Sequence, residues 1–245
     1  MQSMFTHARR GFRGALAIVG VLAVALTSSA RAQGPVLKDG KLTFPEGAEV
    51  SRALTPAERE FLRLNPDYFR DLTGAGSPFA DRVGGVRPPG PILCPGEYEP
   101  AQAILMSWDG SSGQNAILAQ MARHITTTGN AEAFMVVDTA TEQTTVTTTL
   151  TNAGADMSKV KFFVRGTDSI WIRDYGPRFI YLGTRGVAGQ GAVRGIVKHT
   201  YNRPRPNDNN FPVWFATSGF AGQRKHPWFD LGLTHGGGNY HLDSL

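Results

Sequence analysis

One short segment, Trp171-Ile172-Arg173-Asp174-Tyr175-Gly176-Pro177, places an aromatic ring, a guanidinium and a carboxylate within four residues. A carboxylate matches the paired N–H donors of a guanidinium, and an aromatic face attracts the same planar cation. Gly176-Pro177 predicts a turn that fixes the backbone of Asp174. The alternative is a structural ion pair or turn made by Arg173 and Asp174. We interpret the segment as the lip of a pocket for a flat cation.

A second segment, Tyr201-Asn202-Arg203-Pro204-Arg205-Pro206-Asn207-Asp208, carries two arginines that are each followed by proline. A proline disfavours the helical conformation of the residue before it. We therefore expect an extended chain with Arg203 and Arg205 on the same side. Two guanidiniums on one side form a receptor for a carboxylate. The alternative interpretation is a solvated basic loop.

A third segment, Gly236-Gly237-Gly238-Asn239, is rich in glycine. Residues without a side chain let the backbone approach a ligand closely, which makes Gly237 and Gly238 candidates for the wall of a site. Asn239 and the preceding His235 are candidates for its polar lining.

Together the three segments resemble the guanidine-modifying deiminases, most closely the bacterial peptidylarginine deiminases of the Porphyromonas type. The agmatine deiminases share the pattern Trp-x-Arg-Asp-x-Gly-Pro. The resemblance implies that Asp174 is the guanidinium-binding carboxylate and that Trp171 lines the pocket. It further implies that Arg203 and Arg205 hold the α-carboxylate of a C-terminal arginine. In the same family the Gly-Gly-Asn strand, here Gly237, Gly238 and Asn239, lies beside the active site.

The implied reaction is hydrolysis of peptidyl-arginine to citrulline and ammonia. It needs a cysteine thiolate to attack the guanidinium carbon and a histidine to move protons, but no metal or organic cofactor. The family keeps its nucleophile near the C-terminus. We therefore expect both the catalytic cysteine and the catalytic histidine to be absent from this chain, which would cover the first half of a deiminase domain and be inactive alone.

Two nearby patterns imitate catalytic groups. Cys94 is the single cysteine and precedes the first expected strand of the domain, so we interpret it as a small buried hydrophobic residue. His241-Leu242-Asp243 imitates the His-x-Asp of the family but lies within the expected Gly-Gly-Asn strand, and we interpret it as strand residues. A metal site made by His235, His241 and Asp243 would lack a fourth ligand.

Two alternative functions remain open at this point. One is an agmatine-type deiminase of small free guanidines, which a receptor for a carboxylate would not serve. The other is a non-catalytic remnant that binds arginine or a peptide. Under the preferred hypothesis the partners are peptides or proteins with an accessible arginine.

The first 32 residues predict a secretion signal. Three arginines precede an unbroken run of apolar residues and glycine from Ala15 to Leu26, and Ala30-Arg31-Ala32 is a small-x-small cleavage site. Such a run is too short for a membrane span of about 20 residues. The net charge of +5 falls to +1 without this segment, which gives no electrostatic case for nucleic acid. We expect an exported protein, periplasmic or secreted, with no membrane attachment after signal removal.

The rest of the chain divides near residue 92. Residues 33–91 are expected to form a linker and an N-terminal extension, with a short helix that starts at Thr55-Pro56-Ala57-Glu58 and ends at Leu64. Residues 92–245 are expected to form the deiminase domain. Alternating strands and helices in that part predict an α/β sheet with crossover helices. The resemblance implies a five-bladed α/β propeller of ββαβ units, the pentein type, of which this chain covers roughly the first half.

The expected strands are 103–108, 133–137, 160–164 and 178–182, the third of them followed by Ile170-Trp171-Ile172 as a lead into the fourth. The expected helices are 115–125 and 141–150. In the first helix Ile117, Leu118, Met121 and Ile125 form the predicted buried stripe.

Overall fold

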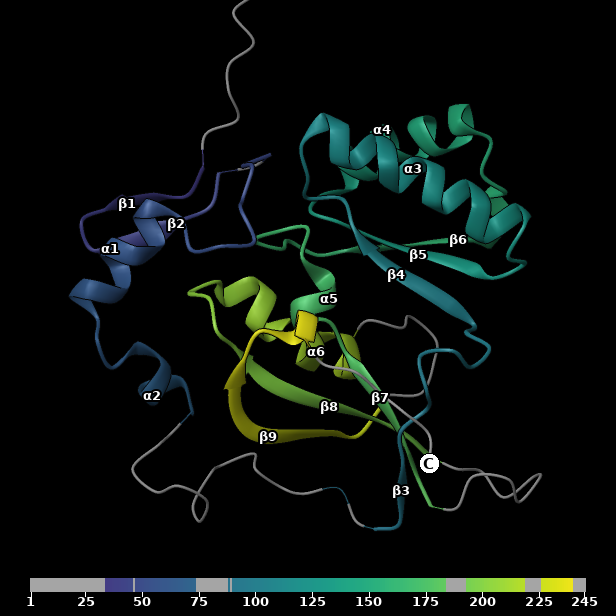
Figure 1. The fold of residues 1–245 in the computed structure, drawn as a ribbon. Helices are drawn as coiled ribbons and strands as arrows, with labels where there is room; N and C mark the ends of the chain where they lie inside the picture. Colours follow the sequence, from purple (N-terminus) through teal and green to yellow (C-terminus); the bar gives the residue numbers. More distant parts are fainter. Residues whose placement is uncertain are drawn as a thin grey trace, which may run out of the picture. The chain divides into compact units, whose positions relative to one another are not determined.

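The computed structural model describes residues 34–45, 47–73, 88, 90–183, 193–218 and 226–239 (Figure 1). Of Asn239 it describes the backbone. The predicted secretion signal lies outside the described residues, as do His241 and Asp243.

The N-terminal part forms a hairpin and two helices. Strands β1 (Val36–Lys38) and β2 (Lys41–Thr43) pair antiparallel, and α1 (Pro56–Leu64) and α2 (Tyr68–Thr73) follow. The predicted helix is confirmed, because Thr55 and Glu58 form a capping box and α1 ends at Leu64. The sequence predicted a linker and an N-terminal extension over residues 33–91, but did not predict the hairpin within it. Its turn, Asp39-Gly40, has positive φ at both residues, a hairpin signal that the sequence analysis overlooked.

The first sheet of the domain is parallel, with strand order β4-β5-β6. Strands β4 (Ala103–Ser107), β5 (Glu132–Val137) and β6 (Val160–Val164) alternate with α3 (Ser112–Thr127) and α4 (Ala140–Ala153), and the short helix η1 (Met157–Lys159) precedes β6. Both long helices lie on one face of this sheet (Figure 1). The predicted alternation of strands and crossover helices is therefore confirmed.

The predicted stripe of α3 is half wrong. Leu118 and Ile125 pack against the core, but the side chain of Ile117 is 62% exposed and that of Met121 is 41% exposed. The buried residues of this helix are Ala119, Ala122 and Thr126, because small side chains let it pack closely on its neighbours.

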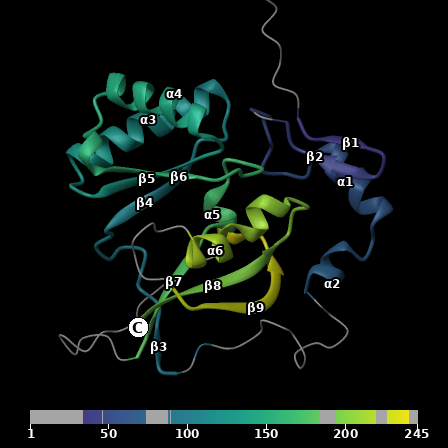
Figure 2. The same cartoon turned by 180° about the vertical axis from the view of Figure 1, so that it is seen from behind.

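The second sheet is mixed, with strand order β3-β7-β8-β9. Strand β3 (Ile92–Leu93) pairs antiparallel with β7 (Arg178–Leu182), which pairs antiparallel with β8 (Val193–Tyr201), and β9 (Trp228–His235) lies parallel to β8. Helix α6 (Pro206–Thr217) connects β8 to β9 and lies against the sheet (Figure 2). Its Phe211 and Phe215 belong to the same buried cluster as Ile196 of β8. The order β7-β8-α6-β9 is one ββαβ unit. The described residues form no closed sheet and do not confirm a five-bladed propeller.

Two site segments differ from the expected strands. Ile172–Tyr175 forms a one-turn helix, α5, so Asp174 lies on a helical turn rather than after a strand. The buried Tyr175 hydroxyl donates to the carbonyl of Ser169 at 2.6 Å, which holds this turn against the loop before it. Gly237–Asn239 forms a short 3-10 helix, η2, after β9 has ended. None of the described helices is both long and apolar enough to cross a bilayer.

Candidate functional site

The carboxylate of Asp174 is the buried acceptor around which the site is arranged. The residue is 4% exposed, and its Oδ2 accepts a hydrogen bond from the Nε of Arg52 at 3.2 Å. The hydroxyl of Tyr201 donates to the same oxygen at 3.4 Å. Asp174 therefore already holds a guanidinium, and the residue that supplies it comes from far earlier in the chain.

The segment from Arg203 to Pro206 does not stay extended as expected. The N–H of Arg205 donates to the carbonyl of Arg203 at 2.8 Å, and α6 begins at Pro206. Proline is favoured in the first turn of a helix, where its missing N–H costs no hydrogen bond, so here it starts a helix instead of prolonging a strand. The pair of prolines that suggested an extended chain instead leads into a helix.

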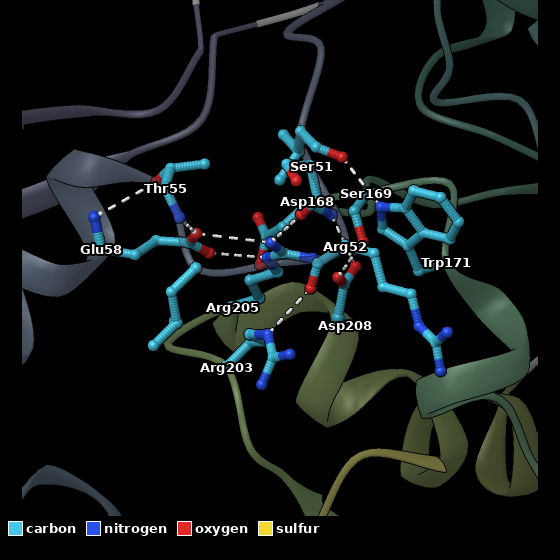
Figure 3. Close-up of polar contacts among 12 residues, drawn as sticks. Ser51, Arg52, Thr55, Glu58, Asp168, Ser169, Trp171, Arg203, Arg205 and Asp208 are labelled. Atoms are coloured by element: carbon cyan, nitrogen blue, oxygen red, sulfur yellow. Dashed lines mark hydrogen bonds and ion pairs between the residues drawn. The ribbon is translucent and has the colours of Figure 1, made fainter. Parts of the chain in front are cut away.

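The guanidinium of Arg205 forms a buried ion pair with Glu58. Both side chains are fully buried, and Nε lies 2.7 Å from Oε1 of Glu58 while Nη2 lies 3.3 Å from Oε2 (Figure 3). Burial alone would lower the pKa of Arg205, but the hydrogen bond and the charge of Glu58 outweigh it and raise that pKa. The same Oε2 accepts the N–H of Thr55 at 2.7 Å, so Glu58 also caps its own helix.

Three consecutive carbonyls of the segment Val50-Ser51-Arg52, here called the strap, accept hydrogen bonds from side chains of the site. The indole Nε1 of Trp171 donates to Val50 at 2.8 Å, and Nη2 of Arg205 donates to Ser51 at 2.6 Å. The Nε of Arg203 donates to Arg52 at 3.0 Å. Figure 3 shows the labelled donors around the strap.

The strap lies in the part that was expected to form a linker and an N-terminal extension, and no role at the site was predicted for it. No motif marks it, because a backbone carbonyl has no sequence signature and a lone arginine in a polar stretch is unremarkable by type. Four of the residues expected to bind substrate, Asp174, Trp171, Arg203 and Arg205, form hydrogen bonds with this one segment. Their substrate roles stay predictions.

Gly237 and Gly238 approach Asp174 closely. A Cβ at Gly238 would lie 2.4 Å from Oδ1 of Asp174 and 2.2 Å from Nη2 of Arg52. A Cβ at Gly237 would lie 2.0 Å from the main-chain oxygen of Asp174. Such distances are far below van der Waals contact, so η2 can cover the carboxylate only because both residues lack a side chain. The contribution of Asn239 to the site stays a prediction.

Two histidines of the second sheet stack on one another, and the sequence did not predict their pairing. The rings of His199 on β8 and His235 on β9 stack with their centroids 4.0 Å apart, and Nδ1 of His199 contacts Nη1 of Arg178. Burial first, and then the charges of Arg178 and His235, lower the pKa of His199 to about 3. Its imidazole is therefore neutral at physiological pH.

Buried carboxylates fix the loop that leads into Trp171. Asp208, at the start of α6, accepts the N–H of Asp168 and the hydroxyl of Ser169, each at 2.7 Å. Asp168 in turn accepts the N–H of Asn207 at 2.7 Å and its side-chain amide at 2.8 Å. Burial raises the pKa of Asp168 and of Asp208. These bonds tie the two motif segments to one another.

Cys94 lies apart from these groups, directly after β3 of the second sheet. Its side chain is half-buried and packs against the cluster of Ile180, Val197 and Phe229. This environment agrees with its interpretation as a small hydrophobic residue. Among the residues that the structure describes, no group of three or more potential ligands could hold a metal ion.

On this α/β fold, a buried carboxylate thus holds the guanidinium of Arg52, with an indole donor and two further arginines bound to the same segment. The family model of the Porphyromonas-type peptidyl-arginine deiminases matches residues 93–244. The chain belongs to this family.

Solved structures of deiminases resemble part of the chain. A C. jejuni agmatine deiminase with substrate bound has 16% identity and a TM-score of 0.41, and covers 57% of this chain. A putative peptidyl-arginine deiminase has 21% identity, and a putative arginine deiminase from Porphyromonas gingivalis has 12%; each has a TM-score of 0.42 and 57% coverage of this chain. The chain spans 39% of the length of the first structure and 40% of the other two.

Proposed function

We propose that the protein is a protein-arginine deiminase, which hydrolyses the guanidinium of a peptidyl-arginine to give citrulline and ammonia. The observation that carries the proposal is the pairing of buried Asp174 with the guanidinium of an arginine whose backbone carbonyl is bound by Arg203. A free guanidine such as agmatine has no carbonyl at that place. Membership of the family supports deimination of a guanidino group in general.

The residues of this chain would bind and orient the substrate. Asp174 would hold the guanidinium by charge and hydrogen bonding, and the covering glycines would keep its surroundings dry. The reaction also needs a thiolate that attacks the guanidinium carbon, a proton donor for the departing ammonia, and a water that releases citrulline. We propose that a C-terminal part of the protein, outside these 245 residues, supplies the cysteine and the histidine.

A substrate with arginine at its C-terminus fits Arg203 best. The Nε of Arg203 donates to the carbonyl oxygen of Arg52, which is the position that one oxygen of a terminal carboxylate would take. Arg205 is engaged by Glu58 and by the preceding carbonyl, that of Ser51. In this proposal Arg203 binds the terminal carboxylate, and Arg205 binds the carbonyl of the residue before the arginine.

The proposal also includes the cellular location of the activity. We place the mature protein outside the cytoplasm, in the periplasm or beyond the cell, because residues 1–32 have the pattern of a secretion signal. Its partners would then be exported peptides and proteins with accessible arginine.

The test is a citrulline assay on the protein expressed from its complete gene. Three substrates are compared: a peptide that ends in arginine, the same peptide with the arginine amidated, and agmatine. We expect kcat/KM to be highest for the first, to fall about tenfold for it in Arg203→Gln, and to fall at least about 100-fold for all three in Asp174→Asn, because a charged hydrogen bond is lost. Preference for agmatine would identify a small-guanidine deiminase instead. Binding of the peptide without citrulline would identify a non-catalytic arginine-binding protein.

A further inference from the structure

The strap carries the same groups that the site would recognise in a peptide substrate. It presents a guanidinium to Asp174, and the carbonyls of three successive residues to Arg203, Arg205 and Trp171. Each donor is a side chain of the two motif segments. The strap itself precedes residues 93–244, the range that the family model matches.

The hydrogen bond between Arg52 of the strap and Asp174 lies on the solvent side of the site. The side chain of Arg52 is 56% exposed, whereas that of Asp174 is 6% exposed. The carboxylate is thus a buried, fixed acceptor, and the guanidinium reaches it from the solvent side. A group held in this way can leave without opening the core, and another guanidinium can take its place.

The ion pair that holds the start of α1, close to the strap, is formed by residues outside the strap. Glu58 and Arg205 are fully buried and tie the start of α1 to the start of α6. The strap can therefore leave its donors while the ion pair of Glu58 stays formed, although this exposes Val50, which is 4% exposed in the structure. Arg205 would keep Glu58 as its partner and would lose only the carbonyl of Ser51.

We propose that the strap is a tethered competitor of the arginine substrate. It occupies three backbone subsites, for the arginine and for the two residues before it. This inference rests on the proposed function of the site. Arg203 binds the carbonyl group of the arginine, Arg205 that of the residue before it, and Trp171 that of the second residue before it. A substrate must displace the strap, so its apparent association constant equals the intrinsic one multiplied by the fraction of molecules in which the strap is released.

Calorimetric titration of the full chain tests the competition. The probes are N-acetyl-Val-Ser-Arg, with a free carboxylate, and agmatine, each against the wild type, Arg52→Ala and Arg52→Gln. We expect both Arg52 variants to bind both probes about 5–10-fold more tightly than the wild type, because the competitor has lost its guanidinium. Arg63→Ala is the matched control, since Arg63 is exposed, pairs with Glu60 on α1 and loses the same charge. It should bind like the wild type.

The subsites are tested in the Arg52→Ala background. Adding Trp171→Phe keeps a ring but removes the N–H donor, so the acetylated tripeptide should bind about 3–10-fold more weakly while agmatine binds unchanged. Equal weakening of both probes would overturn the assignment of Trp171 to a backbone subsite. Equal affinity of the wild type and the Arg52 variants, with clear binding, would overturn the competitor and leave the proposed function standing. Absence of binding in every variant would contradict both.

Discussion

At the scale of single residues, binding of a guanidinium by Asp174 depends on how closely Gly238 approaches this carboxylate. A methyl group at this position would collide with the carboxylate and with any guanidinium bound to it. We expect Gly238→Ala to reduce the affinity for arginine peptides by more than about tenfold and to destabilise the fold by about 1–3 kcal/mol, the usual cost of overpacking. Titration calorimetry and thermal unfolding measure the two effects.

The control for this substitution is Gly113→Ala. Gly113 lies in α3, and a Cβ there would meet no atom within 4 Å. Its affinity for the peptide should equal that of the wild type. Unchanged affinity in Gly238→Ala would show that η2 does not cover the bound guanidinium.

Asp109 gives a prediction about pH. Burial first, and then the charges of Asp138 and Asp168, raise the pKa of Asp109 to about 8. In the unfolded chain the pKa of the same carboxyl is about 4, so protonation of Asp109 favours the folded state. This stabilisation is complete below about pH 4 and is lost as the pH rises to about 8.

The test compares the free energy of unfolding of the wild type and of Asp109→Asn at several pH values. The amide cannot ionise, so the wild type should lose stability relative to the variant between about pH 4 and pH 8. Denaturant unfolding at fixed ionic strength provides the measurement. A constant difference between the two proteins over this range would show that Asp109 has no raised pKa.

At the scale of elements, the buried pair of Glu58 and Arg205 joins α1 to α6. Removing one partner leaves a buried charge without compensation, which costs about 3–5 kcal/mol. We expect Glu58→Ala to destabilise the protein by this amount. The double variant Glu58→Ala, Arg205→Ala should be less destabilised than the sum of the two single variants. Chemical denaturation of the four proteins measures the coupling.

The exposed ion pair of Glu60 and Arg63 on the same helix serves as the control for the buried pair. Solvent screens it, so Glu60→Ala should hardly change the midpoint of unfolding. If Glu58→Ala and Glu60→Ala were equally mild, α1 would not be anchored through Arg205.

Some secondary-structure elements could be predicted from local sequence patterns, and others could not. The capping box of α1 and the alternation of β4 to β6 with α3 and α4 follow from local signals, and both were predictable. The helical turn of Asp174 was not predictable. Its conformation depends on the tyrosine hydroxyl that reaches back to Ser169, a contact that periodicity does not report. The same holds for α6, where Pro206 was interpreted as a sign of extended chain although it begins a helix.

The candidate site was partly predictable for a related reason. Asp174, Trp171, Arg203 and Arg205 could be named because their types and spacing match a chemistry. Glu58 and the strap could not, because a partner that lies more than 100 residues away leaves no trace in a local window. His199 likewise acquires its lowered pKa only from burial beside Arg178 and His235.

At the scale of the whole molecule, the site is assembled from parts that are distant in sequence. The strap precedes the family match and α5 follows the parallel sheet. The start of α6 follows β8 of the mixed sheet, and η2 follows β9. In the proposed function, the described residues bind the guanidinium of the substrate and the backbone next to it. They would orient the substrate for a nucleophile that another part of the protein provides.

The central claim is that Asp174 binds the guanidinium of a peptidyl-arginine. The most direct measurement is calorimetric titration of the wild type and of Asp174→Asn with two peptides that differ only in ending with arginine or with citrulline. We expect the arginine peptide to lose at least about 30-fold in affinity in Asp174→Asn, about 2 kcal/mol, whereas the neutral citrulline peptide binds both proteins with similar affinity. Equal affinity of the arginine peptide for the two proteins would contradict the account.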